Sequence, residues 1–308
     1  AFNNTDGQVT MTQDSSAPEG FANSIKLACT TADTSIAADE YFFMDTKLEG
    51  QNLQTIAKGT SSAKPLALSF YVKGNASATY VVELYDSDNN RNLSKSFSVT
   101  TDWQRVEIAI PADTTGTFDD DNAESLNMAF WLHAGSNFTS GTLDTTWGSN
   151  TNANRAVGIS SFLDSTSRTF FITGVQLEVG QNPTTFEHEP FEATLRKCQR
   201  FFCQTFNYGT TAANNTATNG AFMHGDSASN YEPSVTWRYP VEMNHAPDIT
   251  LFNPESGSTG QWSAGGGVVG SAGRALFIGT SSCVCDNTDT VLAGGNGWRI
   301  QLTADCEL

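Results

Sequence analysis

Short segments of alternating apolar and polar residues recur through the first 180 residues, and they constrain the fold more than any other feature. Turn-forming Gly, Asn and Asp residues separate these segments, and no helical periodicity lies between them. The segments span 8–12, 24–29, 41–48, 66–74, 78–86, 94–100, 103–111, 125–134 and 169–179. Closely spaced strands without intervening helices exclude a parallel α/β fold and predict an antiparallel β-sandwich of the jelly-roll type.

A second group of strand-like segments follows residue 206 and differs from the first in its shorter strands and its glycine content. These segments lie at 234–243, 248–252, 274–280 and 297–308. They predict a second, small β-sandwich domain. The sequence therefore predicts an all-β chain with a jelly-roll domain at 1–182, a linker with one short connecting helix at 183–205, and a C-terminal β-rich domain at 206–308.

The linker contains the one segment with a convincing helical pattern. Pro190 is suited to a helix start, and basic residues gather near the expected end. One apolar stripe recurs at i, i+4, i+7 and i+11, formed by Phe191, Leu195, Cys198 and Phe202. We expect this stripe to pack the two domains together or to pack subunits of a homo-oligomer.

The charge balance excludes one large class of partner. The chain of 308 residues has a formal net charge of −17, and its few Lys and Arg residues are scattered. Nucleic-acid binding requires clustered cations, so we expect no nucleic-acid partner. No apolar run approaches the roughly 20 residues that a membrane-spanning helix needs, so we also expect no membrane insertion.

Six cysteines are too few for a disulfide scaffold in a chain of this length. Two interpretations remain for Cys198, Cys203, Cys283 and Cys285. They could hold zinc, although their spacing does not match known zinc motifs. Alternatively, they are buried free thiols that behave as small apolar side chains.

No catalytic motif stands out in the sequence. The four histidines are far apart, and neither a nucleophile elbow, a zinc-protease motif nor a phosphate-binding loop is present. Adjacent acids such as 119–121 are more typical of solvated turns than of a catalytic pair. We therefore expect a non-enzymatic protein without catalytic residues.

The alternation in three central strands separates a core face from an opposite face. The core face carries apolar residues at alternate positions of 66–73, 78–86 and 125–134. The opposite face combines aromatic rings with polar neighbours, namely Tyr71, Glu83, Tyr85, Asn127, Trp131 and His133. Such a surface is typical of sugar binding, because rings stack on sugars while polar groups hydrogen-bond to hydroxyls. The alternative is that a loop or a second subunit covers this face.

The long segment at 134–168 is rich in Gly, Ser, Thr and Asn, and a loop of this length is usually functional or disordered. Its Trp147 must pack on the domain itself, a neighbouring subunit or a glycan. Two acidic turns, 86–90 and 113–121, offer oxygen atoms that suit calcium, although they match no defined calcium loop. Their alternative is simple solvation, and we expect no other cofactor.

One segment of the chain is especially distinctive, TGVQLEVGQNPTTFEHEPFEATLRKCQRFF. This segment, most of 20–205 and, more loosely, the closing GWRIQLTADCEL resemble a family of virion structural proteins of tailed bacteriophages. That family includes tail fibre and carbohydrate-binding-module-like proteins. Glu189 stands where a basic residue is common in the family, so the family's salt bridge is not carried over. The resemblance implies a carbohydrate-binding-module-like jelly roll joined by a helix to a β-rich tip, assembled as a homotrimer on the virion.

The sequence thus favours a tail fibre or receptor-binding protein that contacts a host cell-surface polysaccharide, alongside other virion proteins, without covalent chemistry. One rival is a capsid decoration or head-fibre protein, in which neighbours bury the sugar-like face. The other is a glycan depolymerase or the binding module of one. The tentative glycan site consists of Tyr71, Glu83, Tyr85, Asn127, Trp131, His133 and Trp147.

Overall fold

A computed structural model describes residues 1–212, 220–224, 234–263, 269–270, 273–287 and 298–307. The chain divides into two compact units, Ala1–Glu187 and His188–Leu308. Each unit is an all-β structure with its own core. The helix predicted within the linker falls in the second unit.

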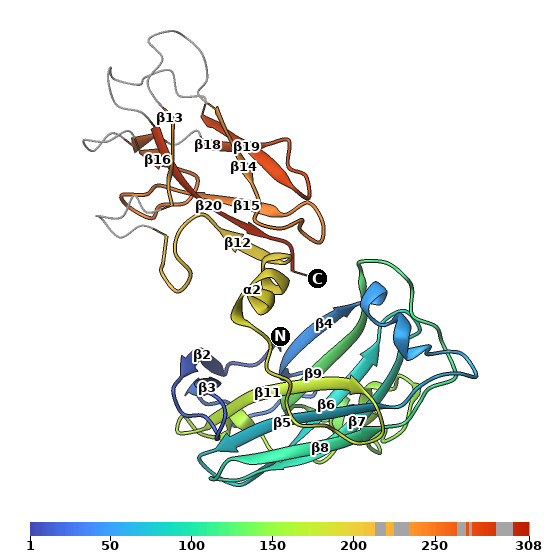
Figure 1. Ribbon diagram of the computed structural model, residues 1–308. Helices are drawn as coiled ribbons and strands as arrows, with labels where there is room; N and C mark the ends of the chain where they lie inside the picture. Colours follow the sequence, from blue (N-terminus) through green and yellow to red (C-terminus); the bar gives the residue numbers. More distant parts are fainter. Residues whose placement is uncertain (213–219, 225–233, 264–268, 271–272, 288–297, 308) are drawn as a thin grey trace. The chain divides into compact units, whose positions relative to one another are not determined.

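The first unit is a jelly-roll sandwich of two antiparallel sheets, and all nine predicted strands are confirmed. The six-stranded sheet has the order β1 (Phe2–Asn3), β4 (Tyr41–Glu49), β9 (Glu124–Ala134), β6 (Ala78–Asp86), β7 (Arg91–Val99) and β10 (Gly148–Ser149). The five-stranded sheet has the order β2 (Gln8–Asp14), β3 (Ser24–Thr31), β11 (Thr169–Val179), β5 (Leu66–Gly74) and β8 (Gln104–Ile110). In Figure 1, β11, β5 and β8 lie in front of β9, β6 and β7.

The core lies between the two sheets and contains the residues that the alternation assigned to it. Strand β5 contributes Leu66, Leu68, Phe70 and Val72, which are all buried. Strands β6 and β9 supply the opposing layer from Tyr80, Val82, Leu84, Leu126, Met128, Phe130 and Leu132. Phe70 packs edge-on against Phe97 and Phe130, with ring centroids 5.1 Å apart in each pair. Burial of these rings and branched chains provides the main stabilisation of the sandwich.

The structure corrects one assumption about the candidate glycan face. Strand β5 pairs with β11 and β8, whereas β6 pairs with β7 and β9. Tyr71 therefore lies on the outside of one sheet, while Tyr85 and Trp131 lie on the outside of the other. Alternation shows which side chains face the core, but it does not show which sheet a strand joins.

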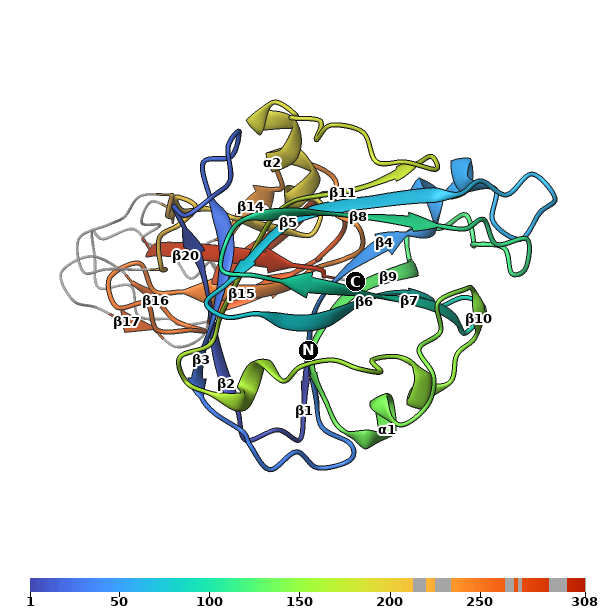
Figure 2. The same cartoon turned by 90° about the horizontal axis from the view of Figure 1, so that it is seen from below.

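Part of the segment 135–168, including Phe138, Leu143, Ala156 and Ile159, covers the outer face of the six-stranded sheet, whereas Phe162 and Leu163 belong to the core between the sheets. This segment contains α1 (Ser136–Thr139), β10 and the 3-10 turns η3 (Asn152–Asn154) and η4 (Phe162–Asp164). Figure 2 shows α1 and its flanking segments on the side of β6 and β7 that faces away from β5 and β8. Two further 3-10 turns, η1 (Gly50–Asn52) and η2 (Gln54–Ile56), follow β4.

The second unit consists of small antiparallel sheets around a separate core. Its longest described strand, β20 (Trp298–Asp305), pairs with β12 (Phe202–Gln204), β13 (Phe222–His224), β15 (Asp248–Phe252) and β16 (Trp262–Ser263), and β16 pairs with β17 (Val269–Gly270). A further sheet has the order β14 (Ser234–Arg238), β19 (Ser282–Asn287) and β18 (Gly273–Leu276). The predicted segments at 234–243, 248–252, 274–280 and 297–308 all contain strands.

The predicted helix is confirmed as α2 (Phe191–Gln199), which begins directly after Pro190. Phe191 is 80% exposed, Cys198 is exposed and Leu195 is half-buried. Phe202 is not helical and belongs to β12, so Cys198 is the last member of the stripe that lies on the helix. Glu189, just before the helix, accepts a hydrogen bond from Lys197 at 2.5 Å.

No helix in the described parts of the chain is long and apolar enough to cross a membrane. All six cysteines are free, and every one except Cys198 is buried. The five buried cysteines fit the interpretation as free thiols, one of the two given above. Cys198 does not fit it, because its side chain is exposed. The Cys283 and Cys285 sulfurs are 3.8 Å apart. Within the described residues, no metal-like cluster includes a cysteine.

Candidate functional site

Trp131 is fully buried on the outside of β9, beneath residues 135–168. Its indole N–H donates to Glu83 Oε2 at 2.9 Å, and Arg155 donates to both oxygens of Glu83 at 2.8 Å. Tyr41, Phe43 and Phe138 pack around the indole ring. Trp131 and Glu83 therefore form an internal anchor for the covering segment, and neither presents a surface to a sugar.

The remaining residues predicted for this face are also engaged within the unit. His133 is fully buried and contacts Ser161 through Nδ1 at 2.8 Å. Asn127 donates to Asp45 at 2.9 Å. Tyr85 is half-buried, donates to Asn90 at 3.1 Å and lies beneath the Arg155 guanidinium. The covered-face alternative accounts for this part of the prediction.

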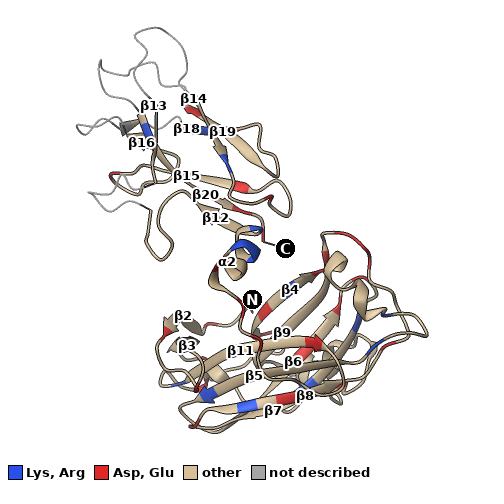
Figure 3. Cartoon of the chain, in the orientation of Figure 1, with Lys and Arg blue, Asp and Glu red and all other residues tan. Residues whose placement is uncertain are grey.

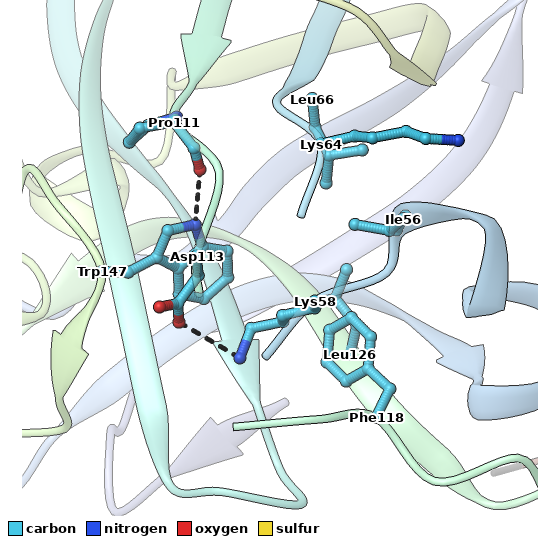
Figure 4. Close-up of a pocket in the computed structure, with 9 residues that line it drawn as sticks. All are labelled: Ile56, Lys58, Lys64, Leu66, Pro111, Asp113, Phe118, Leu126 and Trp147. Atoms are coloured by element: carbon cyan, nitrogen blue, oxygen red, sulfur yellow. Dashed lines mark hydrogen bonds and ion pairs between the residues drawn. The ribbon is translucent and has the colours of Figure 1, made fainter. Parts of the chain in front are cut away.

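Trp147 packs on its own domain, which was one of the three alternatives. Its indole N–H donates to the Pro111 carbonyl at 3.0 Å, and the Lys58 ammonium lies 5.3 Å from the ring centroid. Figure 4 shows Trp147, Lys58 and Phe118 around a small pocket at the end of the sandwich. The pocket holds about 10 Å³ of water-accessible space, so it admits no sugar.

The two acidic turns are organised by buried cations. Lys58 contacts the fully buried Asp86, and it lies 3.2 Å from Asp113. Arg91 donates to both oxygens of Asp113 at 2.9 and 3.1 Å. Asn89 fills further acceptor positions of Asp86. The chain's own cations therefore occupy the place of a metal ion beside Asp86 and Asp113, whereas Asp119, Asp120 and Asp121 are exposed.

The outer face of the five-stranded sheet carries a different set of aromatic and polar groups. Register brings Lys26 of β3, Phe171 of β11 and Lys73 of β5 into one row across the sheet. Trp103 ends this row, and its ring centroid is 6.2 Å from that of Phe171. The next row places Tyr71 beside Arg105. We call this surface the aromatic-cationic face; it comprises Lys26, Tyr71, Lys73, Trp103, Arg105 and Phe171.

The cations of this face lie close to its rings. Lys73 is 5.1 Å from the Phe171 centroid and 5.7 Å from the Trp103 centroid, and Lys26 is 5.5 Å from Phe171. Figure 3 marks Lys and Arg positions in blue on the strands of this sheet. Cation–π contacts hold both ammonium groups over the sheet, and Lys73 also donates to the Ser16 hydroxyl at 3.0 Å. The face therefore combines hydrogen-bond donors with half-buried Tyr71 and Trp103 rings.

A β-bulge in β11 shapes one side of the face. The register between β11 and β5 shifts between Thr173 and Gln176, and Gly174 there has a φ of +60°. A Cβ on Gly174 would approach Phe21 Cζ to 2.6 Å and the Tyr71 ring to 3.1 Å. Only glycine fits this position, and its absence of a side chain lets Phe21 lie against Tyr71, with centroids 5.3 Å apart.

After β11 the chain returns along the same face. Phe186 packs on Phe21 at 5.0 Å, and Arg105 donates to the Thr184 carbonyl. The Thr184 N–H donates to Glu178 at 2.7 Å, and this bond is the main cause that holds the pKa of Glu178 below its ordinary value. The returning segment thus borders the aromatic-cationic face on one side.

Sequence reasoning included Tyr71 but missed Trp103 and Phe171. Both were visible as aromatic residues within predicted strands, and their alternation with the core-facing Phe170 and Val106 placed them outward. They were missed because the outward-facing residues of only three segments were compared, 66–73, 78–86 and 125–134. Phe21 lies in a loop, where no periodicity shows its direction.

The second unit contains a separate open pocket of about 420 Å³. Its lining includes Gln199, Gln204, Tyr208 and Trp237. Tyr208 is 45% exposed and accepts a hydrogen bond from Gln199 at 3.1 Å. This pocket provides amide groups and one accessible ring, so it is a second surface that a sugar could contact.

No protein-family model matches the chain, and no curated protein matches it. Among solved structures, similar chains include one described as "CBM4 structure and function", with 13% identity, a TM-score of 0.29, and coverage of 57% of this chain and 79% of that one. Another is the family 11 carbohydrate-binding module from Clostridium thermocellum in complex with a mixed-linked tetrasaccharide, with 15% identity, a TM-score of 0.31 and coverage of 59% and 86%.

A third similar chain is the enzymatically active domain of tailspike protein 4 from bacteriophage CBA120. It shares 12% identity and has a TM-score of 0.30, and the match covers 58% of this chain but only 19% of that one. At these identities and scores, the function must be inferred from this chain's own side chains.

Proposed function

We propose that the chain is a non-catalytic glycan-binding protein of the tailed-phage virion, in the tail fibre or receptor-binding class. The observation that carries glycan binding is the aromatic-cationic face, where Tyr71 and Trp103 lie among Lys73 and Arg105. Rings stack on the apolar faces of sugars, and the cationic groups donate hydrogen bonds to hydroxyl or carboxylate oxygens. The phage assignment rests on the resemblance of most of 20–205, above all 173–202, to virion proteins.

The charged groups of the same face favour glycan binding without hydrolysis. Its titratable groups include Lys26, Lys73 and Arg105. The neighbouring acids Asp14 and Glu107 pair with Lys26 at 3.3 Å and Arg105 at 2.7 Å, and Glu178 accepts from the Thr184 N–H. A glycosidase places two carboxylates on either side of the scissile bond, with one held as an acid. Acids held in ion pairs with adjacent cations are poorly suited to that role.

A microarray of bacterial surface polysaccharides probed with the full chain tests glycan binding. We expect binding to at least one polysaccharide, and we expect Trp103→Ala to remove most of that signal. A chain that binds no host polysaccharide, while the same host still adsorbs the phage through this protein, would overturn the proposal. Release of reducing ends from the polysaccharide would instead support a depolymerase.

The position of the protein on the virion separates the two structural roles. We expect antibody labelling of intact particles to mark the tail, because a receptor-binding protein must reach the host surface. Labelling of capsomers would contradict the tail assignment and support a capsid decoration or head-fibre protein.

A further inference from the structure

Three buried side chains that the glycan proposal does not use meet at one end of the sandwich. Asp33 follows β3, Glu40 directly precedes β4, and His133 is near the end of β9, where it pairs with Phe42. The three residues are 7%, 5% and 0% exposed. One potential ligand atom from each lies within 4.8 Å of the others. Nothing in the aromatic-cationic face requires this arrangement.

Two atoms of this cluster are buried without a hydrogen-bond partner. These are Glu40 Oε2 and His133 Nε2, which lie 3.5 Å apart. Buried polar atoms are nearly always hydrogen-bonded, and 3.5 Å is beyond the usual range for an N–H···O bond. The two atoms therefore do not satisfy each other by an ordinary hydrogen bond, whereas a metal ion bound by both would satisfy them.

The contacts of His133 fix the orientation of its ring. Nδ1 contacts the Ser161 hydroxyl at 2.8 Å, and Nε2 lies 3.5 Å from Glu40 Oε2. When Nδ1 carries the proton and donates it to Ser161, the lone pair of Nε2 can bind a metal ion.

The surrounding hydrogen bonds hold the carboxylate of Asp33 in a fixed orientation. It accepts from the Thr5 hydroxyl at 2.7 Å, from the Asp6 N–H at 3.0 Å and from the Ser35 N–H at 3.1 Å. Second-shell bonds of this kind orient metal-binding carboxylates in known sites. The same bonds tie the N-terminal segment to the β3–β4 connection.

The separation between His133 Nε2 and Glu40 Oε2 fits a small divalent ion. Ligands about 2.1 Å from a tetrahedral zinc ion lie roughly 3.4 Å from one another. The separation of 3.5 Å between His133 Nε2 and Glu40 Oε2 agrees with such an edge. One imidazole and two carboxylates suit zinc or a similar transition ion better than calcium, which prefers all-oxygen sites.

We propose that His133, Glu40 and Asp33 bind one divalent transition ion of the zinc class, which joins the N-terminal segment, the β3–β4 connection and the end of β9. This site is separate from the acidic turns at 86–90 and 113–121, in which Lys58 and Arg91 pair with Asp86 and Asp113. The ion has a structural role, because its ligands are buried and lie apart from the aromatic-cationic face.

Zinc titration of the full, chelator-stripped chain tests this site by calorimetry and native mass spectrometry. We expect one ion per chain and a rise in melting temperature on zinc addition. His133→Gln and Glu40→Gln should each weaken zinc binding at least about tenfold. The exposed His245→Gln is the matched control and should bind zinc like the wild type. Absence of stoichiometric binding in the folded wild type would overturn the proposal.

Cobalt substitution in the wild type keeps the test valid if a variant fails to fold, and it separates this site from the buried cysteines. We expect cobalt absorption bands without sulfur-to-metal charge transfer, because the proposed ligands are nitrogen and oxygen. Charge-transfer bands from thiolate would place the ion at the cysteines and contradict the assignment. Calcium binding that survives in His133→Gln would contradict it as well.

Discussion

At the scale of single residues, the tryptophans show where sequence reasoning succeeds and where it ends. Alternation placed Trp131 outside the core correctly, but the covering segment at 135–168 buries it completely. Trp103 alternates equally well and remains half-buried on the opposite sheet. The covering depends on contacts between residues far apart in sequence, such as Arg155 with Glu83, which no local pattern reports.

The Arg155–Glu83 pair predicts a large cost for removing one partner. Arg155→Met leaves the fully buried Glu83 carboxylate without its cation, and this should lower the free energy of unfolding by about 3–5 kcal/mol. Urea unfolding measures the change. The matched control is Arg168→Met, whose partner Asp164 is 42% exposed and whose loss should cost about 1 kcal/mol or less. Equal costs for the two variants would contradict this account.

The lowered pKa of Asp113 predicts that the folded chain loses part of its stability at low pH. Burial raises its pKa, but the Arg91 guanidinium, the Thr115 N–H and Lys58 outweigh burial and hold the pKa below its ordinary value. Below about pH 4 the unfolded chain therefore takes up this proton before the folded chain does. The stabilisation is present above that pH and is lost as the pH falls through the folded-state pKa.

Unfolding measured from pH 7 down to pH 3 should show the loss, and Asp113→Asn should flatten the slope at the acid end. An identical slope in the variant would show that Asp113 does not contribute. The measurement compares slopes and not absolute stabilities, because Asp113→Asn also disturbs the contacts with Arg91 and Lys58.

At the scale of elements, the strands followed from their two-residue period, and the helix followed from its stripe and Pro190. The assignment of strands to sheets could not be predicted, because a two-residue period is the same in both sheets. This is why Tyr71 was grouped with Tyr85. The bulge at Gly174 was also invisible, since one glycine in a strand does not indicate which rings approach it.

The bulge predicts a specific effect on binding. Gly174→Ala combines a strained positive φ with a contact of 2.6 Å to the Phe21 ring, so it should displace Phe21 and Tyr71 and weaken glycan binding. Gly158→Ala is the matched control, because it has a φ of +83° and no atom within 4 Å of the added Cβ. Both variants should lose about 1–2 kcal/mol of stability from backbone strain.

Only Gly174→Ala should lose affinity in an equilibrium titration with the bound polysaccharide. Unchanged affinity in Gly174→Ala, or equal losses in both variants, would show that the Phe21–Tyr71 side of the aromatic-cationic face does not contact glycan.

At the scale of the whole molecule, the helix stripe motivates the proposal of a homotrimer. Phe191 is 80% exposed, and Leu195 is only half-buried. A large apolar side chain at such a position is typical of an interface between subunits. We expect the full chain to sediment as a trimer, and Phe191→Asp to shift it towards monomer. A wild-type chain that sediments as a monomer at micromolar concentration would contradict this proposal.

We propose that the aromatic-cationic face contacts glycan. Calorimetric titration of the full chain with its polysaccharide measures this contact. Trp103→Ala should raise Kd by roughly five- to thirtyfold, because a stacked ring contributes about 1–2 kcal/mol. Tyr85→Ala, on the covered sheet, should bind like the wild type. Unchanged affinity in Trp103→Ala, with a loss in Tyr85→Ala or in Tyr208→Ala of the second unit, would contradict the account.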